Sequence, residues 1–96
     1  MIDAAPGHLE TVKAILTRHL PEREVWVFGS RATATAKEYS DLDLAVIGDI
    51  PLDLGQLAVL EHDFDESDHP FKVDVVDWAA ASESFRQIIR KTAVVL

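Results

Sequence analysis

Two short segments decide the fold of this 96-residue chain: VWVFGS at residues 25–30 and SDLDLAV at residues 40–46. The first is an apolar run, rich in residues that favour strands, and it leads into the small pair Gly29 and Ser30. The second starts a new apolar run with two carboxylates, Asp41 and Asp43. Because successive side chains of a strand point to opposite faces, both carboxylates are expected on one face. The sequence therefore predicts two hard oxygen ligands directed at one place beside a small-residue turn.

Such an arrangement suits a polyphosphate held over metal ions. Gly29 permits close backbone approach to a phosphate, and the Ser30 hydroxyl and nearby N–H groups can donate to its oxygens. Phosphoryl and nucleotidyl transfer commonly use two divalent ions about 3.5 to 4 Å apart. The alternative for Asp41 and Asp43 is a solvated strand end, but unpaired carboxylates next to an apolar core are costly. Ser30 also fits the N-cap of a short helix, and both roles use the same geometry.

The remaining elements follow from apolar spacing and from cap residues. We expect helices at about residues 6–20, 30–35 and from residue 53 to beyond Leu60, and a last one that starts at Ser82 and ends near residues 93–96. Strands are expected at residues 25–28, 41–47 and 72–78. Asp53 and Gln56 form a possible capping box, and the acidic residues 63–70 are expected in a surface loop. This order predicts an α/β sandwich with a small mixed β-sheet.

These residues resemble a known family. The block Gly29-Ser30-Arg31-Ala32, followed by Ser40-Asp41-Leu42-Asp43-Leu44-Ala45-Val46, is similar to the signature of the minimal nucleotidyltransferases (MNT), small members of the DNA polymerase β superfamily. The resemblance covers almost the whole chain, and it implies one minimal nucleotidyltransferase domain over residues 1–96 with helices flanking a small mixed sheet. One departure is visible, because members often carry a glycine where this chain has Ala34.

The resemblance also implies the site. Nucleotide binding falls to Gly29, Ser30 and Ser40, and the metal-binding and catalytic residues are Asp41, Asp43 and Asp74. Two Mg²⁺ ions are the implied cofactors and ATP the implied substrate, and the third acid, Asp74, can help deprotonate the attacking hydroxyl. Asp77 competes with Asp74, but its place at the strand end favours a capping or solvated role. Arg31 is open between a phosphate or partner contact and a solvated side chain.

The function that the resemblance implies is a two-component unit with a small helical protein of the HEPN type. In some such pairs the partner is an RNase toxin, and the MNT antitoxin blocks it by transferring AMP from ATP to a tyrosine. In others the partner is a substrate-binding subunit. Two alternatives stay open: a non-catalytic antitoxin that acts by binding, and the catalytic subunit of a small-molecule nucleotidyltransferase. The chain has no room for a second, substrate-binding domain, which favours a partner.

Composition narrows the function further. With 17 acidic and 9 basic residues the net charge is −8, which opposes non-specific nucleic-acid binding by this chain alone. The absence of cysteine excludes disulfides, thiolate catalysis and cysteine-based zinc sites. No stretch is apolar enough to cross a membrane, and the start lacks the features of a secretion signal. The sequence therefore predicts a cytoplasmic protein with no membrane contact.

Overall fold

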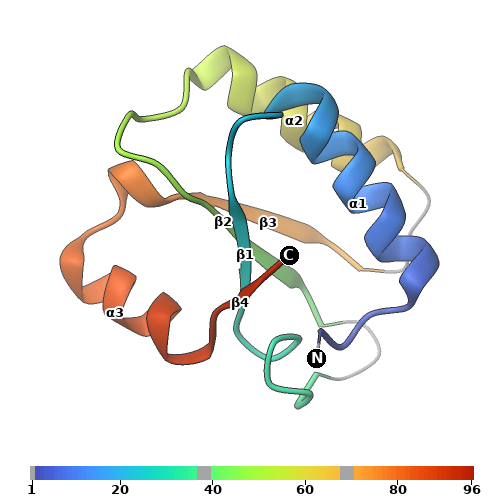
Figure 1. Ribbon diagram of the computed structural model, residues 1–96. Helices are drawn as coiled ribbons and strands as arrows, with labels where there is room; N and C mark the ends of the chain where they lie inside the picture. The colour runs from blue at the N-terminus through green and yellow to red at the C-terminus, as the bar shows by residue number, and fades with distance from the viewer. Residues whose placement is uncertain (1, 37–39, 68–70) are drawn as a thin grey trace.

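The elements alternate along the chain much as expected. The computed structural model describes residues 2–36, 40–67 and 71–96. Their order is α1 (Pro6–His19), β1 (Val25–Phe28), β2 (Leu42–Val46), α2 (Leu54–Glu66), β3 (Val73–Asp77), the 3₁₀ helix η1 (Trp78–Ala80), α3 (Glu83–Thr92) and β4 (Val94–Val95) (Figure 1). None of the helices in these described ranges is long and apolar enough to cross a membrane.

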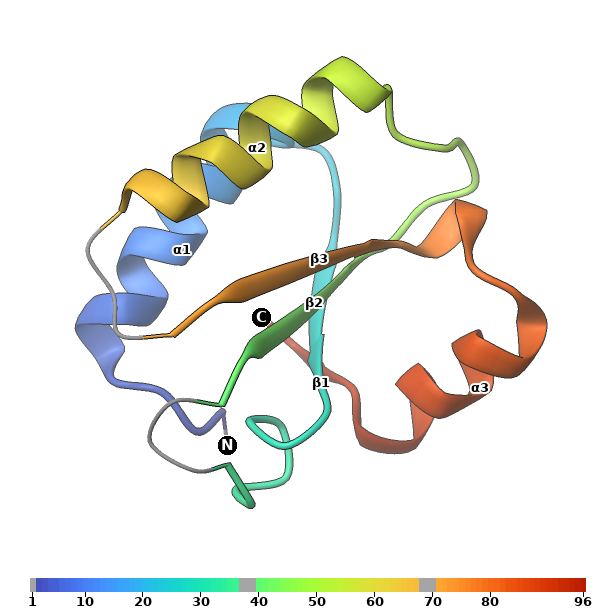
Figure 2. The ribbon, with the colours of Figure 1, turned by 180° about the vertical axis from the view of Figure 1, so that it is seen from behind.

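The sheet is mixed, with the strand order β3-β2-β1-β4. β1 is antiparallel to both β2 and β4, whereas β2 and β3 are parallel. Parallel neighbours need a crossover connection, and α2 supplies it between β2 and β3 (Figure 2). The register sets Asp43 opposite Phe28 on one side and opposite Asp74 on the other. The topology thereby brings the two carboxylate-bearing strands together.

Helices cover both faces of the sheet. α1 and α2 lie side by side on one face, and α3 lies on the other (Figures 1 and 2). The main core fills the space beneath α1 and α2, and its buried members include Val12, Ile15, Leu16, Val27, Leu42, Leu44, Val46, Leu60, Phe64 and Val73. The smaller core beneath α3 contains Phe28, Ala45 and Ile89. Burial on both faces explains why the strands read as apolar runs.

Two sequence-based expectations about the elements were wrong. Residues 30–34 form turns rather than a short helix, because the Ser30 carbonyl accepts the N–H groups of both Thr33 and Thr35. The last helix ends at Thr92, and the β-branched residues Val94 and Val95 pair with β1 as an edge strand.

The predicted helix starts are confirmed in their main features. Asp53 caps α2 by accepting from the Gly55 N–H at 2.8 Å, and Ser82 caps α3 by accepting from the Phe85 N–H at 3.2 Å. The reciprocal half of the capping box is not formed, since the Gln56 side chain donates instead to the His19 carbonyl. α2 also continues to Glu66, so the first half of the expected acidic loop is helical, and residues 68–70 lie outside the described residues.

Candidate active site

The structure places the three predicted carboxylates on the face of the sheet that α3 covers. Leu42 and Leu44 enter the main core, so alternation turns Asp41 and Asp43 to the opposite face. Asp74 pairs with Asp43 across the parallel ladder and shares its face. All three acids lie at the end of the sheet where β1 runs into Gly29 and where β2 and β3 begin.

The acids lie close enough together to change the ionisation of Asp41 and Asp43. A hydrogen bond with Asp74 is the largest cause of the raised pKa of Asp41, and burial and the Asp74 charge add to it, while Lys72 and Arg31 oppose it. The pKa of Asp43 is raised chiefly by burial and further by the charges of Asp74 and Asp41. Burial and neighbouring carboxylates therefore both disfavour the ionised forms of Asp41 and Asp43 in the free protein.

Lys72 is a site residue that the sequence reasoning missed. Its Nζ lies 3.3 Å from Asp74 Oδ1, and its side chain is 68% exposed. The hydrogen bond to Asp74, together with the charges of Asp74 and Asp41, raises the pKa of Lys72. The available signal was spacing, because a residue two positions before Asp74 on a strand faces the same way. Lys72 offsets part of the negative charge of the free site.

Gly29 gives Asp43 room to approach the turn. Its φ of +76° lies in the left-handed region, and a Cβ atom built on it would lie 2.7 Å from Asp43 Oδ2. The Gly29 N–H donates to Thr92 Oγ1 at 2.9 Å, so the last residue of α3 also fixes this turn. The Asp43 carboxylate therefore requires a glycine at position 29, because a side chain there would collide with it. This reason adds to the close phosphate approach that the sequence predicted.

The two serines of the predicted nucleotide site stand on either side of this turn. Ser30 is half-buried, and its carbonyl oxygen accepts the N–H groups of Thr33 and Thr35. Ser40 is also half-buried and directly precedes Asp41. Its carbonyl oxygen accepts from Arg31 Nε at 2.9 Å.

Two further sequence-based interpretations have clear outcomes. Asp77 is a capping residue, as expected, because its carboxylate accepts the N–H groups of Leu52 at 2.9 Å and Ala79 at 3.2 Å. Of the interpretations left open for Arg31, a solvated side chain is wrong, since Arg31 is 5% exposed. Its guanidinium donates to backbone carbonyls, including that of Asp3 at 2.7 Å.

The donor set fits a divalent cation that arrives with a nucleotide. Within the described ranges, no group of three His, Asp or Glu side chains is arranged as a ready-made metal cage. Magnesium rarely uses such a cage, because one or two carboxylates, water and substrate phosphate oxygens complete its octahedron. The carboxylates of Asp41, Asp43 and Asp74 on one face offer such a partial ligand set, which water and phosphate oxygens would have to complete.

Comparison with known proteins identifies the family. The model of the family described as "Polymerase beta, Nucleotidyltransferase" matches residues 10–96. This chain belongs to the polymerase beta nucleotidyltransferase family. A protein of Haemophilus influenzae named "Probable protein adenylyltransferase MntA" is 50% identical over 95 residues, which make up 99% of this chain and 83% of that relative. The resemblance to the minimal nucleotidyltransferases is thereby confirmed.

Solved structures of the polymerase beta nucleotidyltransferase type confirm the α/β fold. A toxin–antitoxin crystallised with AMP-PNP matches with a TM-score of 0.76 and 24% identity, over 90% of this chain and 69% of that one. A tri-AMPylated Shewanella oneidensis HEPN toxin in complex with MNT antitoxin matches with a TM-score of 0.65 and 24% identity, over 92% of this chain and 69% of that one. At this level of identity the likeness concerns the fold alone.

Proposed function

We propose that this chain is a magnesium-dependent nucleotidyltransferase that transfers AMP from ATP to a tyrosine hydroxyl of a HEPN-type toxin and thereby acts as an antitoxin. The observation that carries the proposal is the meeting of Asp41, Asp43 and Asp74 on one sheet face beside the Gly29-Ser30 turn. The 50% identity to a named probable protein adenylyltransferase supports the reaction class. The solved HEPN toxin in complex with an MNT antitoxin supports the kind of partner.

Each site residue has a role in this reaction. The acceptor oxygen attacks the α-phosphorus of ATP, the bond to the bridging oxygen breaks, and pyrophosphate leaves. Asp41, Asp43 and Asp74 would hold two Mg²⁺ ions, which supply charge neutralisation and in-line placement of the reacting oxygens. Ser30 donates to a phosphate oxygen, and Ser40 lies at the same site. Asp74 accepts the proton of the attacking hydroxyl, and Lys72 lies close enough to Asp74 to balance its charge until the metal arrives.

The proposal places the protein in the cytoplasm, as one minimal domain that relies on a partner for its acceptor. ATP and a protein hydroxyl are the two substrates, and the chain's net charge of −8 keeps it from holding nucleic acid by charge alone.

Labelled ATP tests the reaction directly. The purified chain is incubated with Mg²⁺, ATP labelled at the α-phosphate and the HEPN-type protein encoded beside it, and label is expected on a tyrosine of that partner. Asp43→Asn and Asp41→Asn should each reduce transfer by about 100-fold or more, because an amide keeps the shape but attracts a divalent cation weakly. The fold should survive Asp43→Asn. Burial and the neighbouring charges raise the pKa of Asp43, so the folded state disfavours its charged form and should tolerate a neutral amide.

Asp53→Asn is the matched control. It makes the same change of charge at a helix cap, where asparagine serves as well as aspartate. It should transfer AMP at the wild-type rate. Near-normal transfer by Asp43→Asn would sink the metal assignment. A wild-type chain that blocks the toxin without labelling it would favour the antitoxin that acts by binding alone.

A further inference from the structure

We infer that Arg31 is a positioning residue of this site, which holds the Gly29-Ser30 turn and the segments that carry the metal-binding carboxylates in a fixed relation. The inference rests on the proposed function for its kinetic consequences. The contacts of Arg31 are observed in the structure and do not depend on that function.

Among the described residues, the Arg31 side chain contacts three segments that are separate in the sequence. Its Nε donates to the carbonyl oxygen of Ser40 at 2.9 Å, and its Nη1 donates to the carbonyl oxygen of Asp3 at 2.7 Å. Its guanidinium also lies over the ring of Phe71, 4.3 Å from the ring centroid. One side chain thus joins the N-terminal segment, the residues that lead into β2 and the residue before Lys72.

Arg31 and two of its partners, Ser40 and Phe71, lie near site residues along the chain. Arg31 directly follows Ser30, and Ser40 directly precedes Asp41. Phe71 lies three positions before Asp74 and is buried in the main core. The backbone of Arg31 is anchored as well, because its carbonyl oxygen accepts from the Asp3 N–H at 2.6 Å. A shift of Arg31 would therefore move the phosphate-binding turn relative to the carboxylates.

The chemistry of arginine suits this task. Its guanidinium is planar and directs its donors in fixed directions, so two carbonyls and an aromatic face define its place more tightly than an ammonium would. The side chain is only 5% exposed, and burial of a charge is costly unless its donors are satisfied. Reacting groups depend on such placement, since a displacement of about 1 Å can cost on the order of 100-fold in rate.

Arg23 offers a matched control. It is also partly buried, and it also donates to two backbone carbonyls, those of Ile47 at 3.4 Å and Ile50 at 2.7 Å. These carbonyls lie past the other end of β2, away from the carboxylates. Loss of Arg23 should therefore cost stability in a similar way without moving the site.

The experiment compares Arg31→Gln, Arg31→Lys and Arg23→Gln with the wild-type chain. Melting curves first set a temperature at which each variant is folded. At that temperature we measure the Kd for AMP-PNP with Mg²⁺ by calorimetry, and kcat and KM for AMP transfer to the partner. Arg31→Gln should lose about tenfold or more in kcat/KM and bind AMP-PNP more weakly, whereas Arg23→Gln should stay within about twofold of the wild type. Arg31→Lys should recover part of the loss.

Amide hydrogen exchange without nucleotide supplies a readout that does not depend on activity. The N–H groups of Ala32, Thr33 and Thr35 in the turn, and that of Leu42 in β2, are hydrogen-bonded in the free protein. We expect faster exchange of these amides in Arg31→Gln but not in Arg23→Gln. A wild-type chain without transfer would refute the proposed function and leave this exchange result as the test of Arg31.

The inference is overturned if Arg31→Gln matches Arg23→Gln in both kinetics and exchange. Should Arg31→Gln fail to fold, Arg31→Lys decides in its place. Wild-type kinetics together with wild-type exchange in Arg31→Lys would show that the planar guanidinium of Arg31 has no positioning role.

Discussion

Ala34 has a strained backbone conformation, at a position where the family resemblance leads one to expect glycine. Among the described residues other than glycine, it alone has a positive φ, of 58°. A side chain in the left-handed region costs about 1 to 2 kcal/mol, because Cβ crowds the following carbonyl oxygen. The glycine that the family resemblance leads one to expect at this position would remove this cost.

We expect Ala34→Gly to stabilise the folded chain by about 0.5 to 1 kcal/mol, since relief of the left-handed conformation exceeds the added entropy of the unfolded chain. Urea denaturation with a common m-value measures the difference. Ala36→Gly is the control, because Ala36 lies in the same loop without a positive φ and should gain nothing from glycine. Equal effects of the two substitutions would contradict the conformational argument.

At the residue scale, the sequence predicted what depends on local periodicity. The common face of Asp41 and Asp43 follows from strand alternation, and the capping role of Asp77 follows from its place at a strand end. Lys72 could have been found from its spacing to Asp74, whereas Arg31 escaped prediction because its partners come from distant segments. An arginine in a small-residue loop gives no local sign that a backbone carbonyl and an aromatic ring will enclose it.

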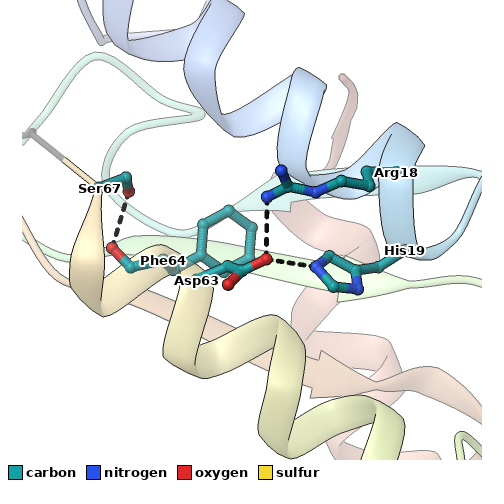
Figure 3. Close-up of polar contacts among 5 residues, drawn as sticks. All are labelled: Arg18, His19, Asp63, Phe64 and Ser67. Atoms are coloured by element: carbon teal, nitrogen blue, oxygen red, sulfur yellow. Dashed lines mark hydrogen bonds and ion pairs between the residues drawn. The ribbon is translucent and has the colours of Figure 1, made fainter.

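At the scale of elements, α1 and α2 are joined by a polar cluster in addition to the main core. Asp63 Oδ2 of α2 lies 2.9 Å from Arg18 Nη2 and 2.5 Å from His19 Nε2, both at the end of α1 (Figure 3). Further along α2, the Ser67 hydroxyl donates to the Phe64 carbonyl at 2.8 Å, also drawn in Figure 3, where the helix ends. The cluster holds together two helices that share one face of the sheet.

Asp63 should make the stability of the protein depend on pH. The hydrogen bond from His19 is the main cause of its lowered pKa, and the charge of Arg18 contributes in the same direction, while burial opposes them. A carboxylate whose pKa is lower in the folded state stabilises that state above its ordinary pKa of 3.8, and the contribution is lost as pH falls further. Asp63→Asn should therefore lower Tm at pH 7, and its difference from the wild type should shrink below about pH 4.

Melting curves between pH 3 and pH 8 measure this dependence. Asp65→Asn makes the same change on the exposed side of the same helix and should show no comparable pH-dependent loss. If both variants follow the wild-type curve, the cluster contributes nothing to stability, as is true of many exposed ion pairs.

The elements themselves were predictable where a pattern ran long enough. Helix caps at Asp53 and Ser82 and the apolar strands followed from composition and spacing. β4 has only two residues, so it carries no periodicity, and only its pairing with β1 defines it. The expected helix after Ser30 failed for a local reason, because the Ser30 carbonyl binds two amides of the turn and Ala34 leaves the helical region of φ.

At the scale of the whole molecule, the site acids share one end of a sheet that is covered on both faces. The Asp74 hydrogen bond raises the pKa of Asp41 and burial raises that of Asp43, with neighbouring carboxylate charge adding to both, so the ionised forms of these acids are disfavoured in the free folded protein. A metal nucleotide that binds only the folded chain should reverse this effect. Ligand binding and global stability are therefore linked through these acids.

The effect of Mg-ATP on Tm can show whether Asp74 or Asp77, both on β3, is the third metal-binding acid. At 100 times its Kd, a ligand specific for the folded state contributes about 2.7 kcal/mol, which moves the Tm of a small domain by several degrees. Asp74→Asn should reduce the shift that saturating Mg-ATP produces. Asp77→Asn should lower the starting Tm, because an amide has one acceptor oxygen for the Leu52 and Ala79 N–H groups, yet it should keep the full shift.

Differential scanning calorimetry of the wild type and both variants, each with and without Mg-ATP, decides between the two acids. A shift that disappears in Asp77→Asn and persists in Asp74→Asn would make Asp77 the third ligand. The capping geometry of Asp77 argues against that result, since both of its carboxylate oxygens already accept backbone N–H groups. If the folded wild-type chain itself shows no shift at saturating Mg-ATP, three acids on one face do not make a nucleotide site, and an antitoxin that acts by binding alone becomes the better account of this protein.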